Sequence, residues 1–165
     1  MKIKLKTIIS VAVNISIIFL LVVFRYSGIA SFRLGEAVPM VLLPVIIAIS
    51  MFFGDNASIL SALLAGVLLD SMSADSSWFN TIFFVLAAAV CNFLCNRFLN
   101  RNLKAALTLT AIVSLIYFFL KYLIFFTFAG VTVNYDYFVL YLLPSVVYTA
   151  LFIIPFYFLE RKLAN

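Results

Sequence analysis

The 165-residue sequence contains no histidine, and only 10% of its residues are charged. Soluble domains carry about 25% charged residues and are about half apolar. In this chain 67% of the residues are hydrophobic, and the mean hydropathy is +1.25. No water-soluble core hides so much apolar surface, so lipid must be the solvent. At about 20 residues for each spanning helix, the chain holds at most about six spans, which excludes a sizeable domain outside the membrane.

The lack of histidine also limits the chemistry that the chain can perform. Acyl transfer would need another base, and no serine motif with a nucleophile elbow is present. The only two cysteines, Cys91 and Cys95, lie four residues apart on one predicted helix and do not readily form a disulfide there. They lack further cysteine or histidine to complete a metal site. We therefore predict a protein that is not an enzyme and that has no metal or cofactor.

The hydrophobic runs predict an all-α membrane protein, a compact six-helix transmembrane bundle that forms one domain over residues 1–165. The expected spans are 7–24, 37–53, 57–71, 79–96, 105–128 and 138–159. The alternative for the first run is a secretory signal with a cleavage site at 28–30, although the run exceeds the usual length of about 7–15 residues. In the second span, Pro39 is expected in the first turn and Pro44 at a kink. The third span is short, so we expect other helices to shelter it from lipid.

Basic residues are unevenly divided between the two sides that six spans create. Eight of the eleven lie on the side of both termini: Lys2, Lys4, Lys6, Arg97, Arg101, Lys104, Arg161 and Lys162. The positive-inside rule therefore places both termini in the cytoplasm, together with the basic loop that carries Arg97, Arg101 and Lys104. This division explains the net charge of +5 without nucleic acid. The lipid bilayer is the expected partner, with a further attraction to anionic lipid.

Small and polar residues recur along one side of two predicted helices. The third span carries the row Ser58, Ala62, Gly66 and Asp70, and the fourth carries Ala88, Asn92 and Asn96. Four-residue spacing places each row on one side of its helix, where small residues allow a neighbour to approach closely. Packing inside the bundle is the favoured interpretation, and docking of a partner's helix is the alternative. For the two asparagines, hydrogen bonds between helices are favoured over the lining of a permeation path.

Asp70 and Lys121 are the ionisable residues that the predicted spans place in the outer half of the bundle. A carboxylate in lipid needs a protein partner, headgroups or water. A lysine side chain can bend toward the surface over the expected difference in depth. We predict an ion pair between them, direct or through water. The alternative is that Lys121 extends to the surface on its own and Asp70 is simply interfacial.

Several features of the chain occur together in a known family. The second span begins with Pro39, the third contains Gly66-Val-Leu-Leu-Asp70, and a small-residue fourth span and a basic loop follow. The last span reads LPSVVYTALFIIPFYF, with Pro144 and Pro155. In this layout the chain resembles the rod shape-determining protein MreD family of bacteria.

The resemblance implies a non-enzymatic scaffold of the elongasome, the bacterial cell-elongation machinery that directs peptidoglycan synthesis and rod shape at the cytoplasmic membrane. It implies binding to the single-span protein MreC and links to MreB, RodA and a class B penicillin-binding protein. The family bundle is also similar to the substrate-binding subunits of energy-coupling-factor vitamin transporters, and such a subunit is the alternative function. The polar lining of its site would then come from Asp70, Asn92, Tyr117, Lys121 and Tyr141.

Overall fold

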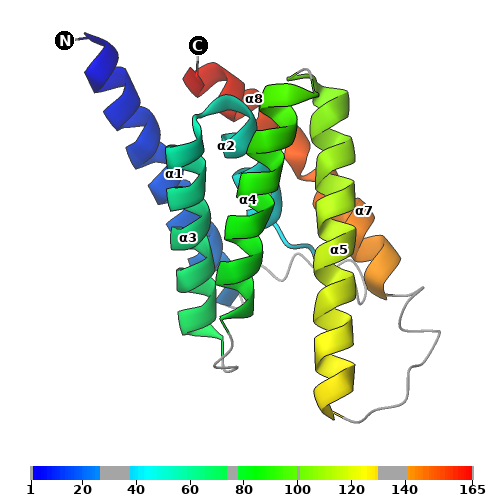
Figure 1. Cartoon of the computed structure of the whole chain (residues 1–165). Helices are drawn as coiled ribbons and strands as arrows, with labels where there is room; N and C mark the ends of the chain where they lie inside the picture. Colours follow the sequence, from blue (N-terminus) through cyan, green and yellow to red (C-terminus); the bar gives the residue numbers. More distant parts are fainter. Residues whose placement is uncertain (1, 27–37, 74–77, 100, 130–140, 165) are drawn as a thin grey trace.

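In the computed structural model, the chain is described over residues 2–26, 38–73, 78–99, 101–129 and 141–164, without the side chains of 2–9 and 125–129. The regular elements of these ranges are helices: α1 (Lys2–Tyr26), α2 (Leu42–Phe52), α3 (Asp55–Met72), α4 (Phe79–Arg97), α5 (Leu103–Ala129), α7 (Leu143–Leu151) and α8 (Ile153–Ala164). Most residues of the connections predicted between the spans lie outside the described ranges. The two termini lie at the same end of the bundle as the α4–α5 connection (Figure 1).

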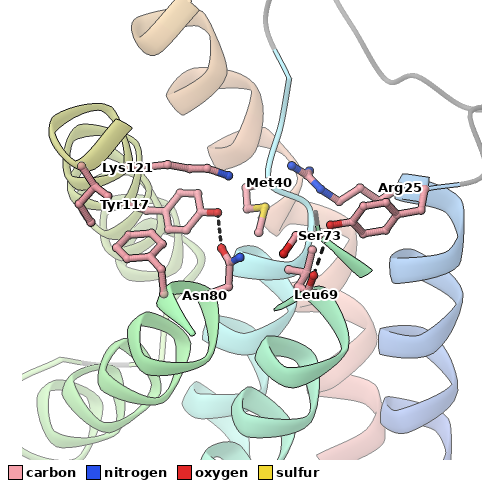
Figure 2. A pocket seen from close by; sticks show the side chains of 10 residues that line it. Arg25, Met40, Leu69, Ser73, Asn80, Tyr117 and Lys121 are labelled. Carbon is pink, nitrogen blue, oxygen red and sulfur yellow. Dashed lines mark hydrogen bonds between the residues drawn. The ribbon is translucent and has the colours of Figure 1, made fainter. Parts of the chain in front are cut away.

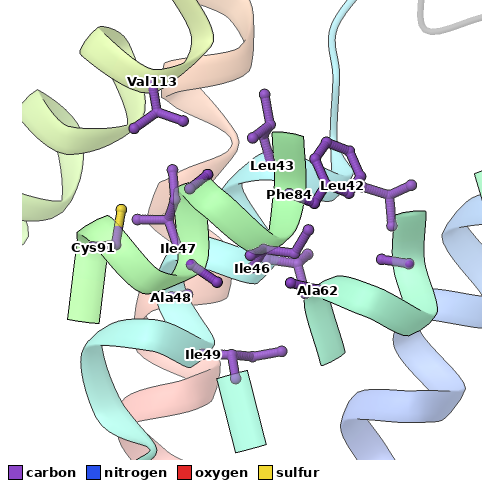
Figure 3. Close-up of a cluster of buried hydrophobic side chains, with 14 of the residues drawn as sticks. Leu42, Leu43, Ile46, Ile47, Ala48, Ile49, Ala62, Phe84, Cys91 and Val113 are labelled. Carbon is purple, nitrogen blue, oxygen red and sulfur yellow. The ribbon is translucent and has the colours of Figure 1, made fainter. Parts of the chain in front are cut away.

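Helix α2 is the centre of the bundle. It contacts each of the other described helices, and ten of its eleven residues are buried. Figure 3 shows Ile46 and Ile47 of α2 within a cluster that includes Phe84 of α4 and Val113 of α5. Because all sides of α2 are apolar, it can be covered by helices in every direction.

The second predicted span, 37–53, differs from the structure at its beginning. Helix α2 starts only at Leu42, so Pro39 precedes the helix and does not lie in its first turn. Pro44 takes that place, where the missing N–H leaves no hydrogen bond unmade, and the predicted kink is wrong. Proline position alone did not distinguish these two arrangements.

The segment 38–40 before α2 is non-helical, and α7 supplies partners for its backbone. The hydroxyl of Thr149 accepts a hydrogen bond from the N–H of Met40 at 3.0 Å, and Ser145 accepts one from the N–H of Val38 at 3.3 Å. In lipid, irregular backbone is tolerated only where protein groups or water satisfy it. The hydroxyls of Ser145 and Thr149 thus allow the non-helical segment 38–40 and the short helix α2 to lie in the middle of the bundle.

The expectation that the third span is sheltered is also wrong. Helix α3 has 18 residues, about 27 Å at 1.5 Å per residue, and it exposes Leu60, Leu63 and Leu64 on its outer side. The sheltered short helix is α2. The expectation rested on the length of 57–71, and α3 begins two residues earlier and ends one residue later than that range.

The last predicted span, 138–159, divides into α7 and α8 around Phe152, and its first three residues lie outside the described ranges. Pro155 has no N–H to offer the carbonyl of Leu151, which accounts for the break. Helix α8 then continues to Ala164. The spans 79–96 and 105–128 match α4 and α5 to within two residues, whereas α1 also takes in the basic leader.

Four helical stretches of the described chain are long and apolar enough to cross a membrane: Asp55–Met72, Phe79–Arg97, Leu103–Ile124 and Leu143–Ala164. Two shorter apolar stretches, Ser10–Tyr26 and Leu42–Phe52, accompany them. Large apolar side chains such as Phe19, Ile82 and Val147 point outward from the bundle. An exposed apolar surface of this kind suits lipid.

Candidate functional site

The predicted rows of small and polar residues on α3 and α4 face each other. Ser58 accepts a hydrogen bond from the Asn92 amide, and both side chains are buried. One turn toward the termini, the Asn96 amide donates to Asp55 at 3.4 Å. Hydrogen bonds between helices in lipid contribute about 0.6–2 kcal/mol each. These side chains thus connect neighbouring helices of the bundle.

Between these polar contacts, α3 and α4 meet through small residues. Ala62 and Ala88 are completely buried. At Gly66 a Cβ atom would lie 2.3 Å from the Cα of Thr81 and 2.9 Å from its backbone nitrogen. No side chain fits there, so glycine at this position sets how closely the two helices approach.

Asp70 lies at the end of α3 and holds the beginning of α4. Its Oδ2 accepts hydrogen bonds from the backbone N–H and the hydroxyl of Thr81 at 2.9 and 2.6 Å, and its Oδ1 accepts one from the amide of Asn80 at 2.7 Å. Trp78, at the cap position of α4, contributes no side-chain hydrogen bond. A carboxylate on the first N–H groups of a helix satisfies unpaired donors and complements the helix dipole. Asp70 therefore caps α4 from a neighbouring helix.

The network continues from Asn80 to α5. The hydroxyl of Tyr117 donates to Asn80 Oδ1 at 2.7 Å, and the Lys121 ammonium lies 5.8 Å from the centre of the Tyr117 ring. Asp70 and Lys121 therefore belong to one connected group of side chains. Their direct pairing stays a prediction, which the charge exchange Asp70→Lys with Lys121→Asp tests: restored assembly supports it, and unrestored assembly means that Asp70 acts through α4.

Sequence reasoning missed Asn80 and Thr81. The available signal was a polar pair in the first turn of an apolar helix whose cap position holds Trp78, with an aspartate in the last turn of the preceding helix. Tyr117, proposed for the polar lining, is buried at the centre of this group, and Tyr141 is half-buried at the start of the last helical stretch.

A second buried polar contact, between α1 and α8, was also missed. Glu160 is completely buried, and Asn14 of α1 donates to its Oε1 and Oε2 at 3.0 and 3.3 Å in the amide orientation that satisfies both groups. Glu160 directly follows the predicted span 138–159, next to the basic residues Arg161 and Lys162. Its spacing from the buried Ile153 and Tyr157 follows the helical period, and that signal places it on the inner side of α8.

Replacing Glu160 with glutamine tests whether the buried carboxyl group lowers the stability of the bundle. Glutamine keeps an acceptor for Asn14 and removes the cost of a buried charge, so we expect stability to be unchanged or higher by about 1 kcal/mol. Glu160→Ala should cost about 2–3 kcal/mol, because it leaves a cavity and an unpaired amide. Thermal unfolding in detergent measures both. Equal losses in the two variants would mean that the charge itself is required.

A small pocket lies beside the Asp70 network, at the end of the bundle away from the termini. Its volume is about 110 Å³, and Figure 2 shows Arg25, Met40, Leu69, Ser73, Asn80, Tyr117 and Lys121 around it. The pocket is therefore formed by the ends of α1, α3 and α4, by the segment 38–40 before α2, and by α5.

The remaining predicted residues occupy distinct surroundings. Cys91 and Cys95 are free thiols buried in the core. The basic loop residues Arg97, Arg101 and Lys104 are exposed, and Arg97 lies 5.7 Å from the centre of the Phe93 ring.

The described helices and their apolar outer surface define the class of the chain: it is a helical membrane protein. In comparisons with protein-family models, curated proteins and solved structures, no match was found.

Proposed function

We propose that the chain is a non-enzymatic membrane scaffold of the MreD type, which holds the single-span protein MreC and through it meets MreB, RodA and a class B penicillin-binding protein. The layout of its helices and motifs supports this, together with an apolar groove on the outside of the bundle. The further proposal is a bundle of six spans in the bacterial cytoplasmic membrane, with both termini in the cytoplasm.

The observation that carries the scaffold proposal is the groove between α1 and α8. It has a volume of about 480 Å³, and its lining includes Ala12, Ser16, Leu20 and Phe156. Ala12 and Ser16 stand one turn apart on the exposed side of α1, the small-xxx-small spacing that allows helices in lipid to pack closely. A single transmembrane helix such as that of MreC suits this groove.

Capture of MreC tests the proposal. The full chain, co-produced with MreC and purified in gentle detergent, should retain it, and Ser16→Leu should weaken retention about tenfold by filling the groove, a loss of about 1.4 kcal/mol. Ala89→Leu, on the exposed side of α4, is the matched control and should retain MreC. No MreC with the original chain would refute the scaffold; equal retention by both variants would refute this groove.

Orientation is tested with a membrane-impermeant maleimide on intact cells. In a chain with Cys91→Ala and Cys95→Ala, we expect Trp78→Cys to be modified and Asn102→Cys to be protected until the cells are permeabilised. Both positions are exposed, at opposite ends of the bundle, so access depends on membrane side. Modification of Asn102→Cys in intact cells would overturn the proposed orientation.

The vitamin-transport alternative draws less support from the same bundle. Sites for small organic ligands measure about 300–1,000 Å³, whereas the polar pocket near Lys121 measures about 110 Å³. Co-purification of an ATPase module with a bound vitamin would favour this alternative over the scaffold.

A further inference from the structure

Hydrogen bonds attach the described part of α1 to its neighbours at two levels of the bundle. At the end away from the termini, the Tyr26 hydroxyl donates to the carbonyl of Leu69 at 3.3 Å, and Arg25 donates through Nη1 to the carbonyl of Pro39 at 3.3 Å. Nearer the termini, Asn14 donates to the carboxyl group of Glu160 on α8. The two levels are about 17 Å apart along α1, at 1.5 Å per residue.

The side of α1 that faces the bundle changes from apolar to polar toward the termini. Its buried side chains recur at four-residue spacing: Ser10, Asn14, Ile18 and Val22. Ile18 and Val22 belong to the hydrophobic core, whereas Asn14 reaches Glu160. Lipid is as apolar as a core side chain, so packing and hydrogen bonds between helices decide where a helix rests. For the polar half of α1, that hydrogen bonding comes from Glu160.

The groove between α1 and α8 lies beside this contact. Its lining on α1 falls between Ala12 and Leu21, and Asn14 lies within the same stretch on the buried side of the helix. Its other wall includes Phe156, one helical turn from Glu160 on α8. The two helices run in opposite directions (Figure 1). The contact therefore bridges the inner side of the groove and sets the distance between its walls.

Burial makes this contact sensitive to the position of α1. Glu160 is completely buried, and Asn14 is 6% exposed. If α1 moved away from α8, both polar groups would lose their partner in a place where lipid supplies no replacement. One spacing of the two helices is therefore favoured over the others.

We propose that Asn14 and Glu160 are positioning residues, whose buried hydrogen bonds hold α1 at a fixed distance from α8 and so keep the groove at the width that a single transmembrane helix fills. Neither side chain needs to touch the occupant. The consequence for a partner rests on the proposed scaffold function. The width of the groove is a property of this chain alone and is measured without a partner.

Cross-linking across the groove measures this width. In the full chain with Cys91→Ala and Cys95→Ala, the substitutions Val13→Cys and Phe156→Cys place one thiol on each wall. A short bis-maleimide reagent joins the two thiols when the walls are at their original distance, and the rate of joining is followed by mass spectrometry.

We expect Asn14→Ala and Glu160→Ala each to slow the cross-linking about fivefold, the loss of one hydrogen bond between helices in lipid. The double alanine variant should be no slower than either single one, because each change removes the same contact. Glu160→Gln keeps an acceptor for Asn14 and should retain the original rate.

Two controls separate positioning from general loss of stability. Ser10→Ala lies one turn from Asn14 on the same buried row, and the Ser10 hydroxyl has no hydrogen-bond partner within the described residues. It should retain the original rate. Asp70→Ala weakens the bundle at the end away from the termini and should also retain it. Slowing by Asp70→Ala equal to that by Asn14→Ala would overturn the proposal.

Co-production of the same variants with MreC separates the failure of this inference from the failure of the scaffold. Slower cross-linking together with about fivefold weaker retention of MreC supports the inference. If the original chain retains no MreC, the scaffold proposal fails, and the cross-linking rates still decide the positioning. Unchanged retention by a variant with slower cross-linking overturns the role of the contact in docking.

Equal cross-linking by the original chain, Asn14→Ala and Glu160→Ala overturns the inference whatever MreC does. Thermal unfolding shows whether each variant is folded. If the alanine variants are not, the exchange of Asn14→Glu with Glu160→Asn provides the test, because it forms the same contact with its partners reversed. It should cross-link at the original rate, and a slower rate would contradict the proposal.

Discussion

Replacing Gly66 with alanine should lower the stability of the bundle by about 3 kcal/mol or more. The new methyl carbon would lie 2.3 Å from the Cα of Thr81, which belongs to the backbone of α4 and has no side-chain freedom to move away. Helices α3 and α4 must then separate. Their separation also lengthens the hydrogen bonds between Asp70 and Thr81, so packing and capping are lost together.

Gly54→Ala is the matched control for this prediction. A Cβ at Gly54 meets nothing within 4 Å, so alanine there should change stability by less than about 1 kcal/mol. Thermal unfolding in detergent, followed by circular dichroism, measures both variants. Equal stability of Gly66→Ala and Gly54→Ala would show that the α3–α4 contact is not as close as described.

Replacing Asp70 with alanine should cost about 3 kcal/mol, since hydrogen bonds to charged groups contribute about 1.5–3 kcal/mol each and water recovers only part of them. The loss leaves the N–H of Thr81 and the amide of Asn80 without their acceptor. Asp70→Asn should also destabilise, because both carboxylate oxygens accept hydrogen bonds and an amide nitrogen in either place faces a donor.

Asp55→Ala provides the comparison within the same helix. Asp55 has the same charge at the other end of α3, but it is exposed and its described side-chain hydrogen bond, from Asn96, is 3.4 Å long. We expect its removal to cost less than about 1 kcal/mol. The difference between the two alanine variants, measured by unfolding in detergent, isolates the capping of α4. Equal losses would assign the effect to charge on α3 alone.

The position of α2 illustrates why the sequence alone did not predict how the interior of the bundle is arranged. Its run of apolar residues reads like any lipid-facing span, and Pro39 and Pro44 both satisfy the preferences of a first turn. The choice between them depends on Ser145 and Thr149. These residues lie more than 100 positions away in the sequence, and their hydroxyls accept hydrogen bonds from the backbone of segment 38–40. No local pattern contains that information.

The Asp70 network shows the same division at the site. The spacing of Gly66 and Asp70 marked both residues as exceptional, and the opposite charge of Lys121 suggested a partner. The partners that the structure adds are the first N–H groups of α4 and the amide of Asn80. Backbone donors have no signature in a sequence, whereas charged side chains are visible at once.

The sequence by itself determined that the chain is a helical membrane protein and that α3 and α4 carry matching small and polar rows. Apolar length and four-residue spacing are local properties, and lipid leaves a helix as the simplest way to satisfy the backbone. Only the tertiary structure decided that α2 is enclosed, that Asp70 caps α4, and that Arg25 and Lys121 meet at one pocket. Those arrangements depend on which helices become neighbours, and that choice is made by packing across the whole bundle.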